Sequence, residues 1–183
     1  MKAVLISIQP KWCELIASGK KTVELRKSKP KIDEPFKCYI YCTNSSGTLH
    51  SAYDGLHYHK SYIGKNDSSC INGKVIGEFV CDEIFPIRVF ENGSIQDYLY
   101  HHMEHSCVPY DDIVNYIGKD RRGYGWHISD LVIYDKPKDL IDFHHACKQP
   151  SGTDCSRCLD EGKTNCWSLI RPPQSWCYVE ELS

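Results

Sequence analysis

Residues 5–27 read LISIQPKWCELIASGKKTVELRK, and the rest of the chain is arranged around this stretch. The apolar run at residues 5–8 predicts a strand. Pro10 stands where a helix can begin, because its fixed φ suits the first helical turn. Apolar residues then recur at helical spacing, and Gly19 follows as the usual left-handed end of a helix. Alternation resumes over residues 22–26, so we expect a strand, a short helix and a second strand.

Three charged side chains after the predicted helix are the first candidates for a functional site: Lys21, Glu24 and Arg26. A lysine held by a glutamate can exchange protons with it, and an arginine can fork onto a phosphate or a carbonyl oxygen. Strict strand alternation puts Glu24 and Arg26 on one face and Lys21 on the other. Lys21 stands at the start of the strand, so its long side chain can still curl toward the same opening. The alternative is a solvated strand edge whose charges deter aggregation.

Length and composition favour one domain with its own core, since the chain has 183 residues and 41% of them are hydrophobic. The formal net charge of -2 excludes a polycation that coats nucleic acid, so an acidic partner has to meet a local basic patch. No apolar run is long enough to span a bilayer, and the N-terminal residues do not read as a leader. We therefore expect a soluble, cytoplasmic protein.

Cysteine is frequent, with 11 residues, and in a reducing compartment thiols fill cores or bind metal rather than form disulfides. Three of them stand in apolar strand patterns and are expected in the core: Cys38, Cys42 and Cys81. Four others have the spacing of a metal site, Cys147-x7-Cys155-x2-Cys158-x7-Cys166. Two thiolates two residues apart can grip one tetrahedral ion, and two more complete a four-sulfur zinc site.

The residues around these four cysteines are small and polar, with little to build a core, so the segment needs a metal or a crosslink to be ordered. We expect a structural zinc ion, because four thiolates leave no open position for catalysis. His144 or His145 could replace Cys147 as a ligand. Two disulfides, or free thiols in a loop, are the alternatives. The domain organisation expected is one domain over residues 1–183 with a zinc-binding insertion at residues 144–168.

The segment of residues 43–72 is rich in Ser, Gly, Asn, His and Tyr and has few aliphatic residues, which predicts a long loop. Lys60 stands there among tyrosines and histidines. Cations interleaved with aromatic rings suit a lid over a nucleotide or a nucleic-acid strand. An unstructured surface loop is the alternative.

The rest of the chain predicts strands at residues 36–42, 74–89 with a turn at Pro86, 124–134 and 175–182, and helices at residues 94–105 and 109–118. Strands with interspersed helices indicate an α+β domain. Arg121 and Arg122 lie in a basic loop, and Tyr124 after them can stack on a base with a phosphate contact beside it. The indoles are expected in the core: Trp12, Trp126 and Trp176.

The motif that carries these charges resembles a known family. Residues 19–26 fit the pattern G-x-K-x-x-E-x-R, and with Ser-Ile-Gln-Pro at residues 7–10 they resemble the signature of the ASCH domain, a branch of the PUA-like superfamily. Residues 73–79, 124–128 and 171–176 resemble the later strands of phage-type and Firmicute-type members. The resemblance implies a PUA-like, partly open mixed β-barrel with helices at its rim. It also implies a pocket at the barrel mouth that accepts a nucleobase or nucleoside.

The resemblance implies two kinds of chemistry, because the family is functionally mixed. Some small bacterial ASCH proteins remove the acetyl group from N4-acetylcytidine. They use a lysine that matches Lys21, a threonine where this chain has Glu24, and a helical glutamate whose approximate counterpart is Glu104. Other members bind RNA or cleave it. For cleavage, Lys21 and Arg26 could stabilise the charge of the transition state while Glu24 takes the 2′-hydroxyl proton.

The function expected is binding of RNA, or of a nucleotide or nucleoside, because a charged triplet without an obvious nucleophile is thin support for catalysis. The ligand-binding candidates are Lys21, Glu24, Arg26, Lys60, Arg121, Arg122 and Tyr124. The first alternative is a small hydrolase of RNA or N4-acylated cytidine nucleosides that uses Lys21, Glu24 and Glu104. The second is a protein-interaction module that uses the zinc insertion.

Overall fold

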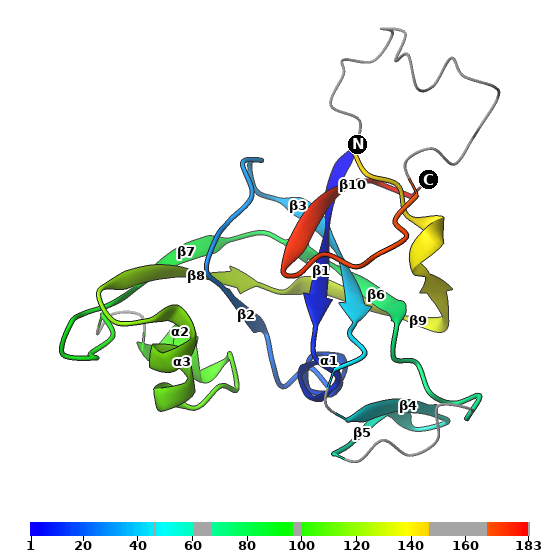
Figure 1. Cartoon of the computed structure of the whole chain (residues 1–183), viewed down its shortest axis with the longest axis horizontal. Helices are drawn as coiled ribbons and strands as arrows, with labels where there is room; N and C mark the ends of the chain where they lie inside the picture. The colour runs from blue at the N-terminus through cyan, green and yellow to red at the C-terminus, as the bar shows by residue number, and fades with distance from the viewer. Residues whose placement is uncertain (46, 61–66, 97–99, 147–167, 183) are drawn as a thin grey trace, which may run out of the picture.

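The N-terminal stretch folds as its pattern predicts. A computed structural model describes residues 1–45, 47–60, 67–96, 100–146 and 168–182 (Figure 1). Strand β1 (Lys2–Ile8) leads into helix α1 (Pro10–Ala17), and strand β2 (Val23–Arg26) follows. Pro10 is buried in the first turn of α1. Gly19 has φ +72°, the left-handed conformation expected after the helix end.

A five-stranded mixed sheet is built on β1. Its order is β10-β1-β3-β6-β9, with β3 at Phe36–Cys42, β6 at Lys74–Cys81, β9 at Ser129–Asp139 and β10 at Trp176–Glu180. β1 and β3 are parallel, because α1 and β2 form the crossover between them, and the other pairs are antiparallel. Alternate residues of β1 belong to separate cores, Ile6 to one and Leu5 to the other. The sheet is therefore covered on both faces, which explains the nearly continuous apolar run in β1.

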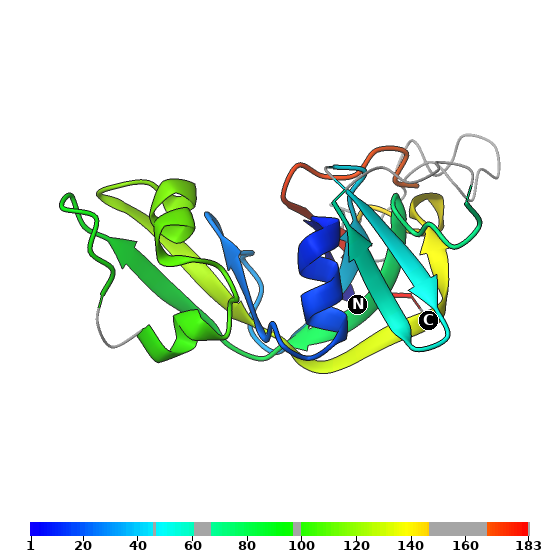
Figure 2. The ribbon, with the colours of Figure 1, turned by 90° about the horizontal axis from the view of Figure 1, so that it is seen from below.

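A second sheet of three strands has the order β2-β8-β7, with β7 at Ile84–Val89 and β8 at Arg121–His127. Two helices accompany it, α2 (Tyr100–Glu104) and α3 (Tyr110–Ile117). Val23 and Leu25 of β2 share a core with Ile113 and Ile117 of α3. Figure 2 shows the molecule as two lobes: a first lobe with the five-stranded sheet and α1, and a second lobe with β2, β7, β8, α2 and α3.

Two chain ribbons run through both lobes. β6 continues into β7, and β8 continues into β9 across Ile128, so each ribbon contributes a strand to both sheets. Where the ribbons pass from one lobe to the other, His127 Nδ1 and Asp82 Oδ1 are 2.7 Å apart. The His127 amide also donates a 2.9 Å hydrogen bond to the Glu83 carbonyl. The α+β architecture of mostly strands, with open sheets and few helices, agrees with the expectation.

Several details differ from the predictions. Residues 43–72 hold a hairpin of β4 (Thr48–Ala52) and β5 (Gly55–His59) rather than only loop, and this hairpin packs against α1. Leu49 is fully buried, and the Tyr58 amide donates to a carboxylate oxygen of Glu14. The strand of residues 74–89 breaks at residues 82–83 and not at Pro86, which is an exposed member of β7.

The helix expected at residues 94–105 is described only as the short α2. The second helix and its end at Gly118 are confirmed, with φ +97° at this glycine. Trp126 is fully buried, as expected, and so are the three cysteines placed in the core, Cys38, Cys42 and Cys81. Trp12 and Trp176 are only partly buried and pack against the core from its edge, so the prediction that they lie in the core holds only in part.

The expected zinc ligands Cys147, Cys155, Cys158 and Cys166 lie outside the described residues. The two ends of their segment lie side by side, because His144 and Ser168 form an isolated β-bridge and the Leu169 amide donates a 2.8 Å hydrogen bond to the Phe143 carbonyl. A short 3-10 turn, η2 (Leu140–Asp142), precedes this point. Close ends fit an insertion into the fold. Zinc binding stays a prediction.

No described helix combines the length and the apolar character needed to cross a bilayer.

Candidate functional site: a cavity at the Lys21–Glu24–Arg26 motif

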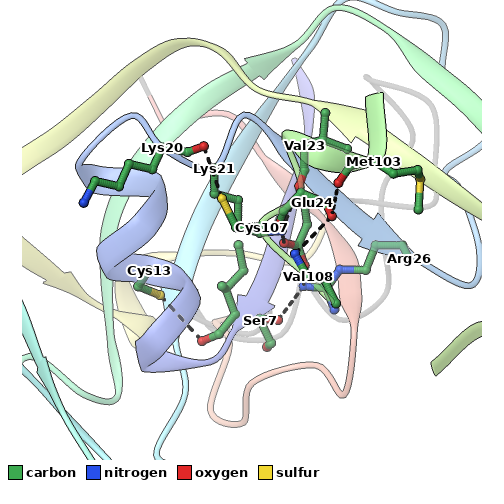
Figure 3. Close-up of polar contacts among 12 residues, drawn as sticks. Ser7, Cys13, Lys20, Lys21, Val23, Glu24, Arg26, Met103, Cys107 and Val108 are labelled. Atoms are coloured by element: carbon green, nitrogen blue, oxygen red, sulfur yellow. Dashed lines mark hydrogen bonds and ion pairs between the residues drawn. The ribbon is translucent and has the colours of Figure 1, made fainter. Parts of the chain in front are cut away.

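The charged side chains of the motif meet at one cavity between the lobes, which we call the motif cavity. Its volume is about 630 Å³. β1 and α1 form one side of it, β2 and the residues just before it carry the charges, and α3 contributes from the second lobe. The residues used below that line it are Lys11, Trp12, Lys21, Glu24, Arg26, Asp112, Tyr116 and Ser175. Figure 3 shows the polar contacts of Lys21, Glu24 and Arg26 with their neighbours.

Lys21 is the most deeply buried of the three, with 1% of its surface exposed. Its ammonium donates hydrogen bonds of 2.7 Å to the Val23 carbonyl and 2.7 Å to the Ser106 carbonyl. It also lies 3.2 Å from Oε2 of Glu24. An ammonium has three donors, so these contacts use all of them. Burial lowers the pKa of Lys21, and the Glu24 carboxylate opposes that shift.

Glu24 stands between the two cations. Its Oε1 lies 2.9 Å from Nη2 of Arg26, and its Oε2 faces Lys21. Nη2 of Arg26 also donates 2.7 Å to the Ser7 carbonyl, which ties β2 to β1. Nη1 donates to Ser175 Oγ at 3.4 Å, a long bond near the start of β10. The network is therefore held from several separate segments of the chain.

The network keeps unused hydrogen-bonding capacity. Nε of Arg26 is buried and has no partner among the residues that the structure describes. A carboxylate has about four lone-pair sites, and the two cations occupy two of those on Glu24. A buried donor without a partner costs free energy, roughly 1–3 kcal/mol, unless a ligand or water satisfies it. The motif can thus offer a donor and an acceptor to a bound molecule.

Aromatic side chains complete the cavity, and sequence reasoning missed them. The Trp12 ring has the Lys11 ammonium 4.2 Å and the Lys21 ammonium 5.3 Å from its centroid. The Lys27 ammonium lies 5.1 Å from the ring centroid of Tyr116, which belongs to α3. Burial raises the pKa of Tyr116 although the charge of Arg26 opposes it, so its hydroxyl is protonated at neutral pH. The sequence held one signal of this role for Trp12. The residue lies beside the buried stripe of α1, which is formed by Pro10, Cys13 and Ile16, and not within it.

The remaining predicted site residues do not line the motif cavity. Glu104 is exposed at the end of α2, and the carboxylate of that region that lines the cavity is Asp112 of α3. Lys60 is exposed just after β5. Arg121 and Arg122 are exposed at the start of β8, paired with Val89 and Arg88. Tyr124 faces a neighbouring cavity.

Across the described part of the chain, no three His, Cys, Asp or Glu side chains are placed to hold a metal ion. The motif cavity combines a buried charged network with aromatic walls.

Comparisons with known proteins bear on the fold. No curated protein matches the sequence. The crystal structure of ASCH from Zymomonas mobilis superposes with a TM-score of 0.58 at 18% identity, covering 98% of this chain and 88% of that one. A mutant of the same protein, ZmASCH, covers 99% of this chain and 92% of its own, again with a TM-score of 0.58 at 18% identity. These structures share the fold, and they lend no support to a phage-type or Firmicute-type subtype.

The sequence itself matches the model of the ASCH domain over residues 6–111, which include the whole 19–26 motif, α1 and the start of α3. Because this match spans more than half of the chain, the protein belongs to the ASCH domain family.

Proposed function

We propose that this ASCH domain binds RNA and holds one nucleotide in the motif cavity. The observation that carries the proposal is the buried Lys21–Glu24–Arg26 network in the wall of a cavity of about 630 Å³. Ligand cavities of about 300–1,000 Å³ are usual for small organic molecules, and a nucleotide falls within that class. The unused donor on Arg26 and the unused acceptor sites on Glu24 suit the edge of a nucleobase, which has donors and acceptors side by side.

Charge and aromatic content support the same ligand. Lys11, Lys21 and Arg26 face Glu24 and Asp112 in the lining, so cations outnumber carboxylates there although the whole chain has a net charge of -2. A local excess of this kind attracts phosphate without making the protein a general polycation. Trp12 supplies a ring on which a base can stack, and stacking on aromatic rings is the usual way to hold an unpaired base.

The test is binding of labelled RNA homopentamers by fluorescence anisotropy, with Trp12→Leu as the variant. The side chain of Trp12 is partly exposed, so the fold should tolerate leucine. Losing one stacked base weakens binding by about 1–3 kcal/mol, roughly 5- to 150-fold. Tyr53→Leu is the matched control, because Tyr53 is fully exposed at the tip of the β4–β5 hairpin and should bind as wild type does. Equal affinity of all three proteins would contradict the proposal.

A second candidate function, hydrolysis of RNA or of an N4-acylated cytidine, is favoured by one contact. The Lys21 ammonium lies 3.2 Å from Glu24, and burial lowers the pKa of Lys21, so the pair could move a proton at the cavity wall. The use of all three ammonium donors favours binding instead, because loss of a proton would leave one acceptor without its donor.

The two functions are separated by Glu24→Gln. We would incubate the wild type and the variant with RNA pentamers and with N4-acetylcytidine and analyse the products by liquid chromatography. A hydrolase shows turnover that Glu24→Gln abolishes while the RNA or nucleoside still binds. A binding protein returns every substrate intact.

A further inference from the structure

A second cavity, which we call the lysine cavity, adjoins the motif cavity. It lies on the connection between β2 and β3, has a volume of about 470 Å³, and involves no part of α1. The charged and aromatic residues that line it are Lys27, Lys29, Lys31, Asp33, Glu34 and Tyr124. Cations outnumber carboxylates, three to two. This cavity has no role in the binding of a single nucleotide described above.

We propose that the lysine cavity takes the next nucleotide of the same strand, so that the ligand is a single-stranded RNA segment and not a free nucleotide or nucleoside. The inference rests on the proposed function of the motif cavity. It also gives Tyr124 a place, because this residue was expected in the ligand site and lines the second cavity rather than the first.

Three links between their lining residues show that the two cavities are neighbours. Arg26 lines the motif cavity and Lys27, the next residue, lines the lysine cavity. The Lys27 ammonium lies 5.1 Å from the ring centroid of Tyr116, a wall of the motif cavity. Tyr124 is the cross-strand partner of Arg26 in the β2–β8 pair. A strand that leaves the base site therefore meets Lys27 first and the lysine cavity next.

The backbone of the lysine cavity is anchored while its ammonium groups stay available. Pro30 is buried, the Lys31 amide donates 2.6 Å to the Tyr178 hydroxyl, and Trp176 Nε1 donates 3.1 Å to Ser28 Oγ. Lys29 and Lys31 are exposed and form no ion pair with any residue in the described ranges. Fixed backbone with unpaired ammonium groups around a tyrosine suits phosphates and a stacked base in a single strand.

The experiment compares the four RNA homopentamers with the four nucleoside 5′-monophosphates, each titrated against the full chain. The variant is Lys29→Gln/Lys31→Gln, and the control is Lys119→Gln/Lys136→Gln, which removes the same charge at exposed positions that line neither cavity. Each lysine that contacts a phosphate adds about 0.7 to the slope of log affinity against log salt for a single strand. The variant should therefore lose about 1.4 of that slope and about 25-fold of pentamer affinity at 0.1 M salt.

The outcomes separate the two proposals. The inference holds when wild type prefers a pentamer to the matching monophosphate, and the lysine variant loses that preference while its monophosphate affinity and the control stay unchanged. Equal wild-type affinity for pentamer and monophosphate, with no effect of the lysine variant, overturns the inference and leaves the motif cavity as a nucleotide site. A wild type that binds neither overturns both proposals. The matching DNA homopentamers are titrated in parallel, and tighter binding of DNA than of RNA overturns the assignment of the strand as RNA.

Discussion

At the scale of the residue, Lys21 has the largest structural task in the site. It joins the end of α1 to β2 through Glu24 and joins β2 to the α2–α3 connection through the Ser106 carbonyl. Trp12 packs near it from α1, with the ammonium 5.3 Å from the ring centroid. A buried and fully paired charge adds little net stability, because its desolvation offsets its pairing energy. Removing it is costly all the same, because its polar partners are then left without hydrogen bonds.

We expect Lys21→Met to lower the free energy of unfolding by roughly 3 kcal/mol, because it leaves two buried carbonyls and one side of Glu24 without a donor. Urea denaturation of the purified protein measures this. Lys37→Met is the matched control. Lys37 pairs with Glu78 and Glu181 at the surface, with 28% of its side chain exposed, and its loss should cost about 0–1 kcal/mol. Equal losses in both variants would show that Lys21 is not held as described.

The sequence predicted the grouping of Lys21, Glu24 and Arg26. Lys21 was the doubtful member, and the start of β2 explains why it joins the other two. Alternation in a strand would turn Lys21 away from Glu24. β2 begins only at Val23, so Lys21 precedes the strand and its side chain is free of that alternation. Asp112 and Tyr116 could not be found in this way. They reach the cavity from α3. Ile113 and Ile117 mark the buried face of that helix, but nothing local in residues 110–117 records that β2 is the element this face meets.

At the scale of the element, β6 depends on one carboxylate that links it to its neighbours. Glu78 accepts a hydrogen bond from the Tyr134 hydroxyl of β9 and lies 2.9 Å from the Lys37 ammonium of β3. Burial alone would raise the pKa of Glu78, yet the hydrogen bonds from Tyr134 and Lys37 bring it below its ordinary value of 4.5. The carboxylate form is therefore bound more strongly in the folded protein than in the unfolded chain.

Because the pKa of Glu78 is lowered in the folded protein, we expect the protein to lose stability in acid. The contribution of Glu78 is complete above pH 4.5 and disappears as the pH falls through the lower folded value. The fall in unfolding free energy from pH 6 to pH 3 should be smaller in Glu78→Gln than in wild type by about 1 kcal/mol at most, since the pair is partly exposed. Tyr134→Phe, which removes one donor and keeps the carboxylate, should be intermediate. An unchanged pH dependence in Glu78→Gln would refute the assignment.

The β4–β5 hairpin was predictable from a local turn motif, although the polar composition of its segment indicated a loop. Polar residues dominate residues 43–72, which argued for a loop. The dipeptide Asp54-Gly55 is nevertheless a strong hairpin signal, and Leu49, Leu56 and Tyr58 alternate with polar residues on either side of it. The strands are stable despite their polarity because α1 covers one face of the hairpin.

At the scale of the whole molecule, the α+β class and the ASCH assignment followed from the 19–26 motif and the order of the strands. The division into two lobes did not, because it depends on where the long strands break. The second sheet begins where residues 82–83 interrupt one ribbon and Ile128 the other, and neither site has a strong breaker. The position of the motif cavity between the lobes is a consequence of these breaks.

The zinc insertion is also a prediction about the whole chain. We expect about one zinc ion per chain by elemental analysis, bound by Cys147, Cys155, Cys158 and Cys166. Cys155→Ser/Cys158→Ser should lose the metal and melt at a lower temperature, while RNA binding persists because Lys21, Glu24, Arg26 and Trp12, which carry the proposed binding, belong to other segments of the chain. Cys70→Ser, which changes a cysteine outside the insertion, should keep the zinc. A metal-free preparation with an unchanged melting temperature would contradict the prediction. A protein partner lost only in the double variant would support the interaction alternative.

The passage of two paired ribbons between the lobes has a consequence for how the lobes can move. The contact of His127 with Asp82 lies where both ribbons pass between the lobes, so a rotation of one lobe against the other would have to bend the chain near this contact. Trp12 belongs to the first lobe and Tyr116 to the second. Any rotation of the lobes at this point would therefore change the distance between the two rings. A change at this junction would then alter how tightly a base is held, although neither His127 nor Asp82 lines the motif cavity.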